Sequence, residues 1–210
     1  NNPKVSFNFI SNNFRYNRFL AEEFTGQVTY NNDTIKFKDV KLKRRSSNYL
    51  LTGSINDITE NGKQTVDIEI STDRGNTREI INFMDYSSPY SINYPFSGSV
   101  NLTGNLTEPT FELDLSVINN FVDIIEIKGK ISNKIDLNIT GDKVPLDLIK
   151  SADLINTDLD FDGNLNFKGT VKGNREEFVI GLDTNLTDLE VLNIKINDIN
   201  GNLSYNSSGR

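Results

Sequence analysis

The chain has 210 residues, a formal net charge of −7 and a hydrophobic content of 36%, and it contains neither cysteine nor histidine. The acidic balance argues against a nucleic-acid partner, because phosphate backbones are bound by basic surfaces. The absence of both residue types excludes disulfides, thiolate metal ligands, thiol nucleophiles and the usual proton carrier near neutral pH.

The N-terminal part of the chain predicts strands around one short helix. Alternating apolar residues in Lys4 to Ile10 and in Phe24 to Tyr30 indicate two strands, because successive side chains of a strand point to opposite faces. Between them, Ser11 to Glu23 carries its apolar residues at a spacing of five and then one, which favours a short helix capped by Ser11 or Asn12.

The next segment predicts a hairpin with an irregular second strand. Asn31-Asn32-Asp33 is expected to form the turn, since these residues tolerate positive φ. In Thr34 to Lys43 the apolar residues change from odd to even positions halfway along the strand. One extra residue near Lys38-Asp39 would bring them back to one face, so the sequence predicts a β-bulge there.

The middle of the chain continues the alternation and then breaks it. Two further strands, from Tyr49 to Ile55 and from Val66 to Ile70, flank a turn at Asn61-Gly62. Asp73 to Tyr86 groups its apolar residues on one side of a helical wheel, which predicts a short amphipathic helix, and Ser87 to Pro95 is expected to be an extended linker.

The stretch from Phe96 to Val117 (FSGSVNLTGNLTEPTFELDLSV) is a two-strand unit with one apolar face, turned at Glu108-Pro109. A second short helix is expected from Pro145 to about Leu154. The remaining expectations are strands over Ile124 to Ile131, Ile135 to Ile139, Leu159 to Val171, Phe178 to Leu182 and Leu186 to Tyr205, with a turn at Gly141-Asp142.

The two-strand unit is repeated. The pattern of Phe96 to Leu115 returns at Phe161 to Leu182, a shorter copy begins at Phe24, and each copy follows a predicted helical patch. Spacings of roughly 65 to 72 residues are typical of repeat architectures, in which neighbouring units stack. The prediction is one elongated β-repeat domain over residues 1–210, mainly β and mostly antiparallel, with copies beginning near 24, 96 and 161.

The segments FSGSVNLTGNLTEPTFELDL and VPLDLIKSADLINTDLDFDGNLNFKGTVKG resemble the repeats of the TamB family, which is related to the AsmA-like proteins. The resemblance covers most of the chain from Phe24 onward. It implies a long, curved sheet of the β-taco kind, whose concave side is an apolar groove. It also implies a periplasmic location within a protein anchored in the inner membrane, a BamA-type outer-membrane barrel as partner, and phospholipid transport or assistance to outer-membrane protein assembly.

The expected groove wall consists of the apolar residues of the two longer copies. They are Phe96, Val100, Leu102, Leu106, Phe111, Leu113, Leu115, Phe161, Leu165, Phe167, Val171, Phe178, Ile180 and Leu182. Four glycines share their parity and are expected to let the sheet curve: Gly98, Gly104, Gly163 and Gly169. Apolar alternation equally fits an ordinary dry core, as in a β-sandwich.

Two charged segments allow two interpretations each. Asp158 to Gly163 resembles the start of a calcium-binding EF-hand loop, but Gly169 occupies the position of its bidentate glutamate, so the aspartates fit the wet face of a strand. The basic run Lys41, Lys43, Arg44 and Arg45 suits either anionic lipid headgroups or a solvated strand end that discourages edge pairing, which is the favoured interpretation.

The sequence therefore predicts a lipid-binding conduit module, without enzymatic activity, cofactor or metal, because nothing resembles a nucleophile beside its base. A structural stalk with a dry core and a chaperone that binds strands at its sheet edges are the alternatives. The chain has no signal peptide or apolar run as long as a membrane span, and it begins without methionine. It is accordingly expected to be a piece of a longer protein that carries its targeting and anchoring segments elsewhere.

Overall fold

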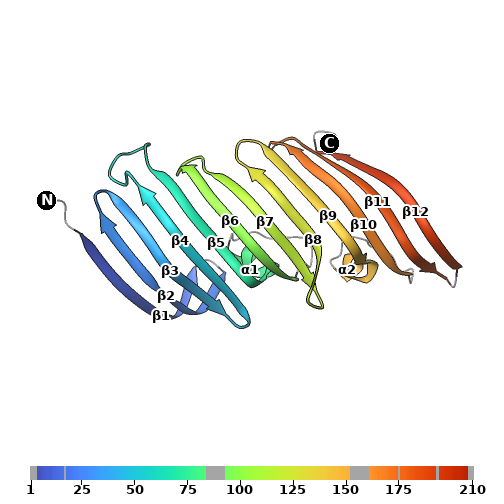
Figure 1. Ribbon diagram of the computed structural model, residues 1–210, viewed down its shortest axis with the longest axis horizontal. Helices are drawn as coiled ribbons and strands as arrows, with labels where there is room; N and C mark the ends of the chain where they lie inside the picture. Colours follow the sequence, from blue (N-terminus) through green and yellow to red (C-terminus); the bar gives the residue numbers. More distant parts are fainter. Residues whose placement is uncertain are drawn as a thin grey trace.

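The computed structural model describes residues 4–16, 18–83, 93–151, 161–174, 176–192 and 194–207. Within these residues, 12 strands form one open sheet, and the order of the strands in the sheet is their order in the chain. Every neighbouring pair is antiparallel, and the strands lie side by side along the longest axis of the molecule (Figure 1). The predicted mainly β, antiparallel architecture is confirmed at this level.

Two short helices interrupt the succession of strands. Helix α1 (Thr77–Phe83) follows β5, and helix α2 (Leu146–Ser151) follows β9. The strands are β1 (Val5–Tyr16), β2 (Phe19–Asn31), β3 (Thr34–Arg44), β4 (Ser47–Asn56), β5 (Thr65–Asn76), β6 (Pro95–Asn105), β7 (Thr110–Asn119), β8 (Val122–Ile131), β9 (Ile135–Pro145), β10 (Phe161–Gly173), β11 (Phe178–Val191) and β12 (Ile194–Asn206).

The turn and the bulge predicted in the first hairpin are both confirmed. Asn32 and Asp33 join β2 to β3 with φ of 46° and 64°, the left-handed values that the tight turn needs. The pairing of β3 with β4 shifts register between Phe37 and Val40, and Asp39 has a φ of 50° there. The extra residue returns Val40 to the face that carries Phe37.

The helix predicted for Ser11 to Glu23 is wrong. This segment forms the end of β1 and the beginning of β2, which pair with each other. Asn13 has a φ of 58°, so the alternation of β1 shifts by one residue there and Phe14 lies on the same face as Phe9. The irregular apolar spacing therefore records a distorted strand, and the first repeat copy follows no helix.

The turn predicted at Gly141-Asp142 is also wrong, because β9 continues through both residues to Pro145. The pairing of β9 with β10 shifts register between Leu165 and Phe167, opposite this point. The ring of Phe167 occupies the space that a Cβ of residue 141 would need. Glycine here marks an irregularity within a strand and not its end.

The two later helices are confirmed in kind, and each begins later than predicted, at Thr77 and at Leu146. The strand β5 extends to Asn76, so α1 begins four residues after the predicted start at Asp73. Parts of several predictions lie outside the described residues. They are the end of the helix predicted over Asp73 to Tyr86, most of the linker that ends at Pro95, the end of the helix predicted from Pro145, and Asp158, Leu159 and Asp160.

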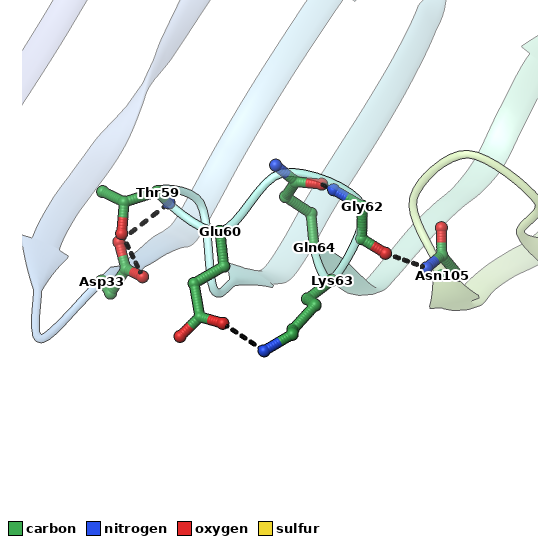
Figure 2. A network of polar contacts seen from close by, with 7 residues as sticks. All are labelled: Asp33, Thr59, Glu60, Gly62, Lys63, Gln64 and Asn105. Carbon is green, nitrogen blue, oxygen red and sulfur yellow. Dashed lines mark hydrogen bonds and ion pairs between the residues drawn. The ribbon is translucent and has the colours of Figure 1, made fainter.

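Three loops at one end of the strands are joined by polar contacts (Figure 2). Asp33, in the β2–β3 turn, accepts hydrogen bonds from the backbone N–H and the hydroxyl of Thr59 at 3.1 and 2.8 Å. The predicted turn at Asn61-Gly62 is confirmed, with a φ of 81° at Gly62, whose carbonyl accepts a 3.1 Å hydrogen bond from Asn105. These contacts hold the loops between β2 and β7 together.

The best-packed core lies at the opposite end of the N-terminal strands. Phe19, Ala21, Tyr49 and Phe96 are buried there, from β2, β4 and β6. The described residues contain no second sheet, so most of the apolar side chains elsewhere are only partly buried.

Candidate functional site

The apolar residues of the sheet are in register from strand to strand. Residues directly opposite each other in antiparallel strands share a face, so a chain of pairings traces a row across one face. One such row runs from β3 to β12 through Val40, Leu51, Ile70, Val100, Leu113, Gly129, Leu137, Val171, Ile180 and Tyr205. A parallel row runs from β1 to β11 through Phe7, Val28, Phe37, Gly53, Ile68, Leu102, Phe111, Ile131, Ile135, Gly173 and Phe178.

The predicted wall residues of the first longer copy mostly belong to this face. Val100 is opposite Leu113, Leu102 is opposite Phe111, and Gly98 is opposite Leu115. Phe96 is different because it is 5% exposed and belongs to the packed core. Leu106 follows the end of β6 and is 41% exposed, so it lies outside the paired rows.

The second longer copy has the same face but a different pairing. Val171 is opposite Ile180, and Gly169 is opposite Leu182. Phe167 is opposite Thr184, and Leu165 is opposite Leu186. If the two copies paired alike, Phe178 would be opposite Phe167, as Phe111 is opposite Leu102. Phe178 is instead opposite Gly173. Phe161 begins β10, and the ammonium of Lys150 lies 5.4 Å from the centre of its ring.

The four predicted glycines differ in backbone conformation. Gly98, Gly104 and Gly163 have φ of 130°, 98° and 145°, values that favour glycine, whereas Gly169 has no such value. Their proposed role in curving the sheet stays a prediction.

A pocket that the sequence did not reveal lies on the apolar face of β1 to β4. It has a volume of about 580 Å³ and is lined by Phe7, Phe9, Ser11, Phe14, Phe24, Val28, Phe37, Val40, Leu42 and Leu51. The ring of Phe24 lies between those of Phe9 and Phe14, with 4.6 Å between ring centres on each side. The wrong helix prediction separated Phe14 from Phe9 and so concealed the pocket. The signal in the sequence was the concentration of phenylalanine before residue 40.

Helix α1 covers the face beside this pocket, held by a buried polar cluster. The Tyr49 hydroxyl donates a 2.8 Å hydrogen bond to Oε2 of Glu79 and accepts one of 3.1 Å from the backbone N–H of Asn76. Burial, followed by the hydrogen bond and the charge of Glu79, raises the pKa of the Tyr49 hydroxyl above its ordinary value. The cluster fixes α1 at one end of the face and leaves the pocket open.

Arg44 completes the cluster from β3. Its Nε lies 3.5 Å from Oε1 of Glu79, and its guanidinium lies 5.5 Å from the centre of the Phe19 ring. Lys41, Lys43 and Arg45 are exposed at the end of β3, as the favoured interpretation expects. Because β3 is paired on both sides, the part of that interpretation in which the run discourages edge pairing is wrong. Arg44 instead balances the buried carboxylate of Glu79.

The opposite face of the sheet is charged. Lysines and acids face each other across neighbouring strands. Nζ of Lys130 lies 3.5 Å from Oε1 of Glu112, and Nζ of Lys128 lies 3.6 Å from Oδ1 of Asp114. These side chains are largely exposed, so each pair contributes little to stability. They keep this face in water.

The fold and its two faces define a single-layer antiparallel β-sheet protein with one apolar and one charged face. Comparison of the chain with protein-family models, curated proteins and solved structures gave no match. In the described ranges, acidic residues form no cluster that could hold a metal ion, and neither helix has the length and apolar character to cross a membrane.

Proposed function

We propose that the apolar face binds the acyl chains of lipids and that the pocket on β1 to β4 is the principal binding site. The observation that carries this proposal is the lining of the pocket, in which Ser11 is the one polar residue. Acyl chains need no directional partners, and each buried methylene contributes about 0.8 kcal/mol. Pockets of a few hundred Å³ are of the size that encloses small ligands.

The two long rows extend the binding surface beyond the pocket. They continue the apolar face across all the described strands, so a lipid bound at β1 to β4 has an uninterrupted apolar path toward β12. We propose that this path is the groove of a conduit built from repeated strand pairs. The recurrence of the two-strand unit along the sequence supports this proposal.

The wider setting is proposed on the resemblance of FSGSVNLTGNLTEPTFELDL to TamB repeats. In that setting the chain is a periplasmic module, without enzymatic activity, of a protein anchored in the inner membrane. The longer protein would carry phospholipid toward the outer membrane or assist protein assembly there, together with a BamA-type barrel.

Lipid binding is tested with a fluorescent fatty acid and two matched variants. Val28→Asp places a charge inside the pocket, whereas Thr29→Asp places the same charge on the opposite face of β2. We expect Val28→Asp to weaken binding at least about tenfold, equivalent to about 1.4 kcal/mol. Thr29→Asp should bind as the unmodified chain does. Equal affinities of all three proteins would contradict the proposal.

The path along the sheet is tested by photocrosslinking to a phospholipid. A photoreactive residue at Leu113 or Phe167 should label lipid, because both positions belong to the apolar face. The same residue at Glu112 or Lys168, one position away on the charged face, should not. Equal labelling of both faces, or labelling of neither, would support a dry core or a purely structural stalk.

A further inference from the structure

We propose that one end of the sheet docks on the surface of an anionic lipid bilayer through the tips of its hairpins. This end, the helix end, is where α1 and α2 lie and where β7 turns into β8 (Figure 1). Because successive strands alternate in direction, the loops after β1, β3, β7 and β11 all lie at the helix end. The loops after β2, β4, β6, β8 and β10 lie at the opposite end, which carries the contacts of Figure 2.

The β7–β8 loop carries a phenylalanine in a conformation that suits it poorly. Asn120 and Phe121 join the two strands with φ of 49° and 67°, so both residues of this tight loop are left-handed. Glycine is the usual second residue of such a loop, because a bulky side chain is strained there. The loop lies in the middle of the sheet, so its surroundings do not depend on what adjoins β1 or β12.

Packing within the chain does not compensate for this strain. The side chain of Phe121 is 94% exposed, and that of Val122 beside it is 61% exposed. A strained residue that contributes no packing to the fold points to a contact outside the chain.

Two other hairpin loops of the helix end follow the same pattern. Leu192, in the β11–β12 loop, has a φ of 50° and is 68% exposed, and Arg45, in the β3–β4 loop, has a φ of 52° and is exposed. In the described loops of the opposite end, the left-handed positions are occupied by residues that tolerate them, namely Asn32, Asp33, Asp57 and Gly62. Turn geometry therefore does not explain the leucine, arginine and phenylalanine at the helix end.

The charges of the two ends also differ. The hairpin loops of the helix end contain Arg18 and Arg45 and no acidic residue. The loops of the opposite end are acidic on balance, with Asp33, Asp57, Glu60, Glu108, Glu176 and Glu177 against Lys63, Lys134 and Arg175. An anionic surface therefore attracts the hairpin tips of the helix end and repels the opposite end.

A bilayer fits this arrangement better than a protein partner does. The strands β5 and β6 separate the hairpin of Arg45 from that of Phe121, and neighbouring strands lie about 4.8 Å apart. A protein hot spot gathers its aromatic and arginine residues in one packed patch. A bilayer surface is continuous, so it receives an aromatic ring at its acyl boundary and separate arginines at its phosphates.

A single tryptophan tests whether the tip enters the bilayer, because the chain contains none. The emission of Phe121→Trp should shift to shorter wavelength on addition of vesicles made of equal parts of phosphatidylglycerol and phosphatidylcholine. Phospholipids brominated on their acyl chains should quench it. Leu106→Trp is the matched control, because Leu106 is an exposed apolar residue in a loop of the opposite end, and its emission should not change.

Two outcomes of this measurement would overturn the proposal. Equal responses of the two variants would show that the chain has no preferred end at the bilayer. No response of Phe121→Trp would leave a protein as the partner of the tip.

Vesicle flotation separates the role of the ring from a role in the fold. Phe121→Gly should weaken binding to the same vesicles at least about tenfold. It should maintain or raise the free energy of unfolding, because glycine suits a φ of 67°. Undiminished vesicle binding would overturn the proposal, and a loss of stability would show that the ring serves the fold instead.

The charge requirement is tested by two matched substitutions. Arg45→Gln should weaken binding to the anionic vesicles about fivefold and should have no such effect with pure phosphatidylcholine. Lys134→Gln removes the same charge from an exposed position at the opposite end and should not weaken binding. Equal losses in the two variants would contradict docking through the helix end.

These outcomes are independent of acyl-chain binding by the apolar face. Phe121 does not line the pocket on β1 to β4, so Phe121→Gly should bind the fluorescent fatty acid as the unmodified chain does. Transfer of lipid from the vesicles to the pocket would leave the emission of Phe121→Trp unchanged. Failure of the docking surface and failure of the proposed function are thus distinguishable.

Discussion

Gly98 lies where a side chain would collide with the backbone of the neighbouring strand. It has a φ of 130°, and a Cβ at this position would overlap the carbonyl oxygen of Asp114 in the next strand. Both features require a residue without a side chain, independently of whether lipid is bound.

Gly98→Ala should therefore lower the free energy of unfolding by about 1–3 kcal/mol or more, the cost of a strained backbone conformation. Urea titration followed by circular dichroism measures this loss. The matched control is Gly181→Ala in β11, where a Cβ would meet no atom within 4 Å. Its stability should equal or slightly exceed that of the unmodified chain. Equal losses in both variants would contradict the argument.

Tyr49 makes the stability of the protein sensitive to alkaline pH. Because burial raises the pKa of its hydroxyl in the folded state, the folded chain retains this proton at a pH where the unfolded chain loses it. The contribution to stability is complete below the unfolded pKa of about 10 and is lost as the pH rises above it.

Tyr49→Phe should remove part of this alkaline loss and should lower the free energy of unfolding at neutral pH by about 1–3 kcal/mol, because Glu79 loses a buried donor. Urea titrations from neutral pH to about pH 11 measure both effects. Tyr30→Phe, at a half-buried position in β2, is the matched control and should leave the free energy of unfolding at neutral pH nearly unchanged. An unmodified chain and a Tyr49→Phe variant with parallel pH profiles would refute the role of the hydroxyl.

The backbone geometry of the bulge in β3 can be tested by two substitutions of one residue. Asp39 has a φ of 50°, which costs about 1–2 kcal/mol for a residue with a side chain. Asp39→Gly should therefore maintain or raise the free energy of unfolding, and Asp39→Val should lower it because a β-branched residue tolerates this conformation poorly. Urea titration of the pair measures the difference. A Val variant as stable as the Gly variant would show that the bulge does not require positive φ.

The sequence predicted strands well where alternation was regular. Phe96 to Val117 formed the expected pair of strands, and the bulge in β3 was predicted from one change of parity. The segment around Asn13 failed because the positive φ of Asn13 shifts the alternation within β1, which gives its apolar residues the irregular spacing of a short helix. Periodicity alone does not distinguish the two.

The candidate site was less predictable than its elements. The parity of each strand identified most residues of the apolar face, such as Val100 and Leu113, because parity is local. The pocket depends on which strands pair and in which register, so Phe14 could be placed beside Phe24 only once β1 and β2 were joined. The burial of Phe96 likewise depends on Tyr49, far away in sequence.

At the scale of the whole molecule, each strand is stabilised by its immediate neighbours. The principal contacts of the described strands are with the adjacent strands, with α1 and α2 adding contacts to β2, β5, β9 and β10. Stability in such a sheet is approximately a sum of neighbour terms, so the ends should open more readily than the centre.

Amide hydrogen exchange should show this gradient. Protection factors should be highest in β5 to β8 and lowest in β1 and β12, measured at a concentration where the chain is monomeric. Loss of protection in one cooperative step across all strands would contradict a sum of neighbour terms. In the same experiment, β3 and β4 should exceed β10 and β11 in protection because the best-packed core lies against the former pair.

The arrangement of the strands in chain order has a consequence for how this architecture can change in evolution. Each strand contacts the one before it and the one after it, so a hairpin can be gained or lost within the sheet while its former neighbours join each other. Because a hairpin contributes two strands, such a change preserves the direction of every strand and the side on which its apolar residues lie. Length is thus free to vary in steps of two strands, whereas the pattern within each strand is constrained.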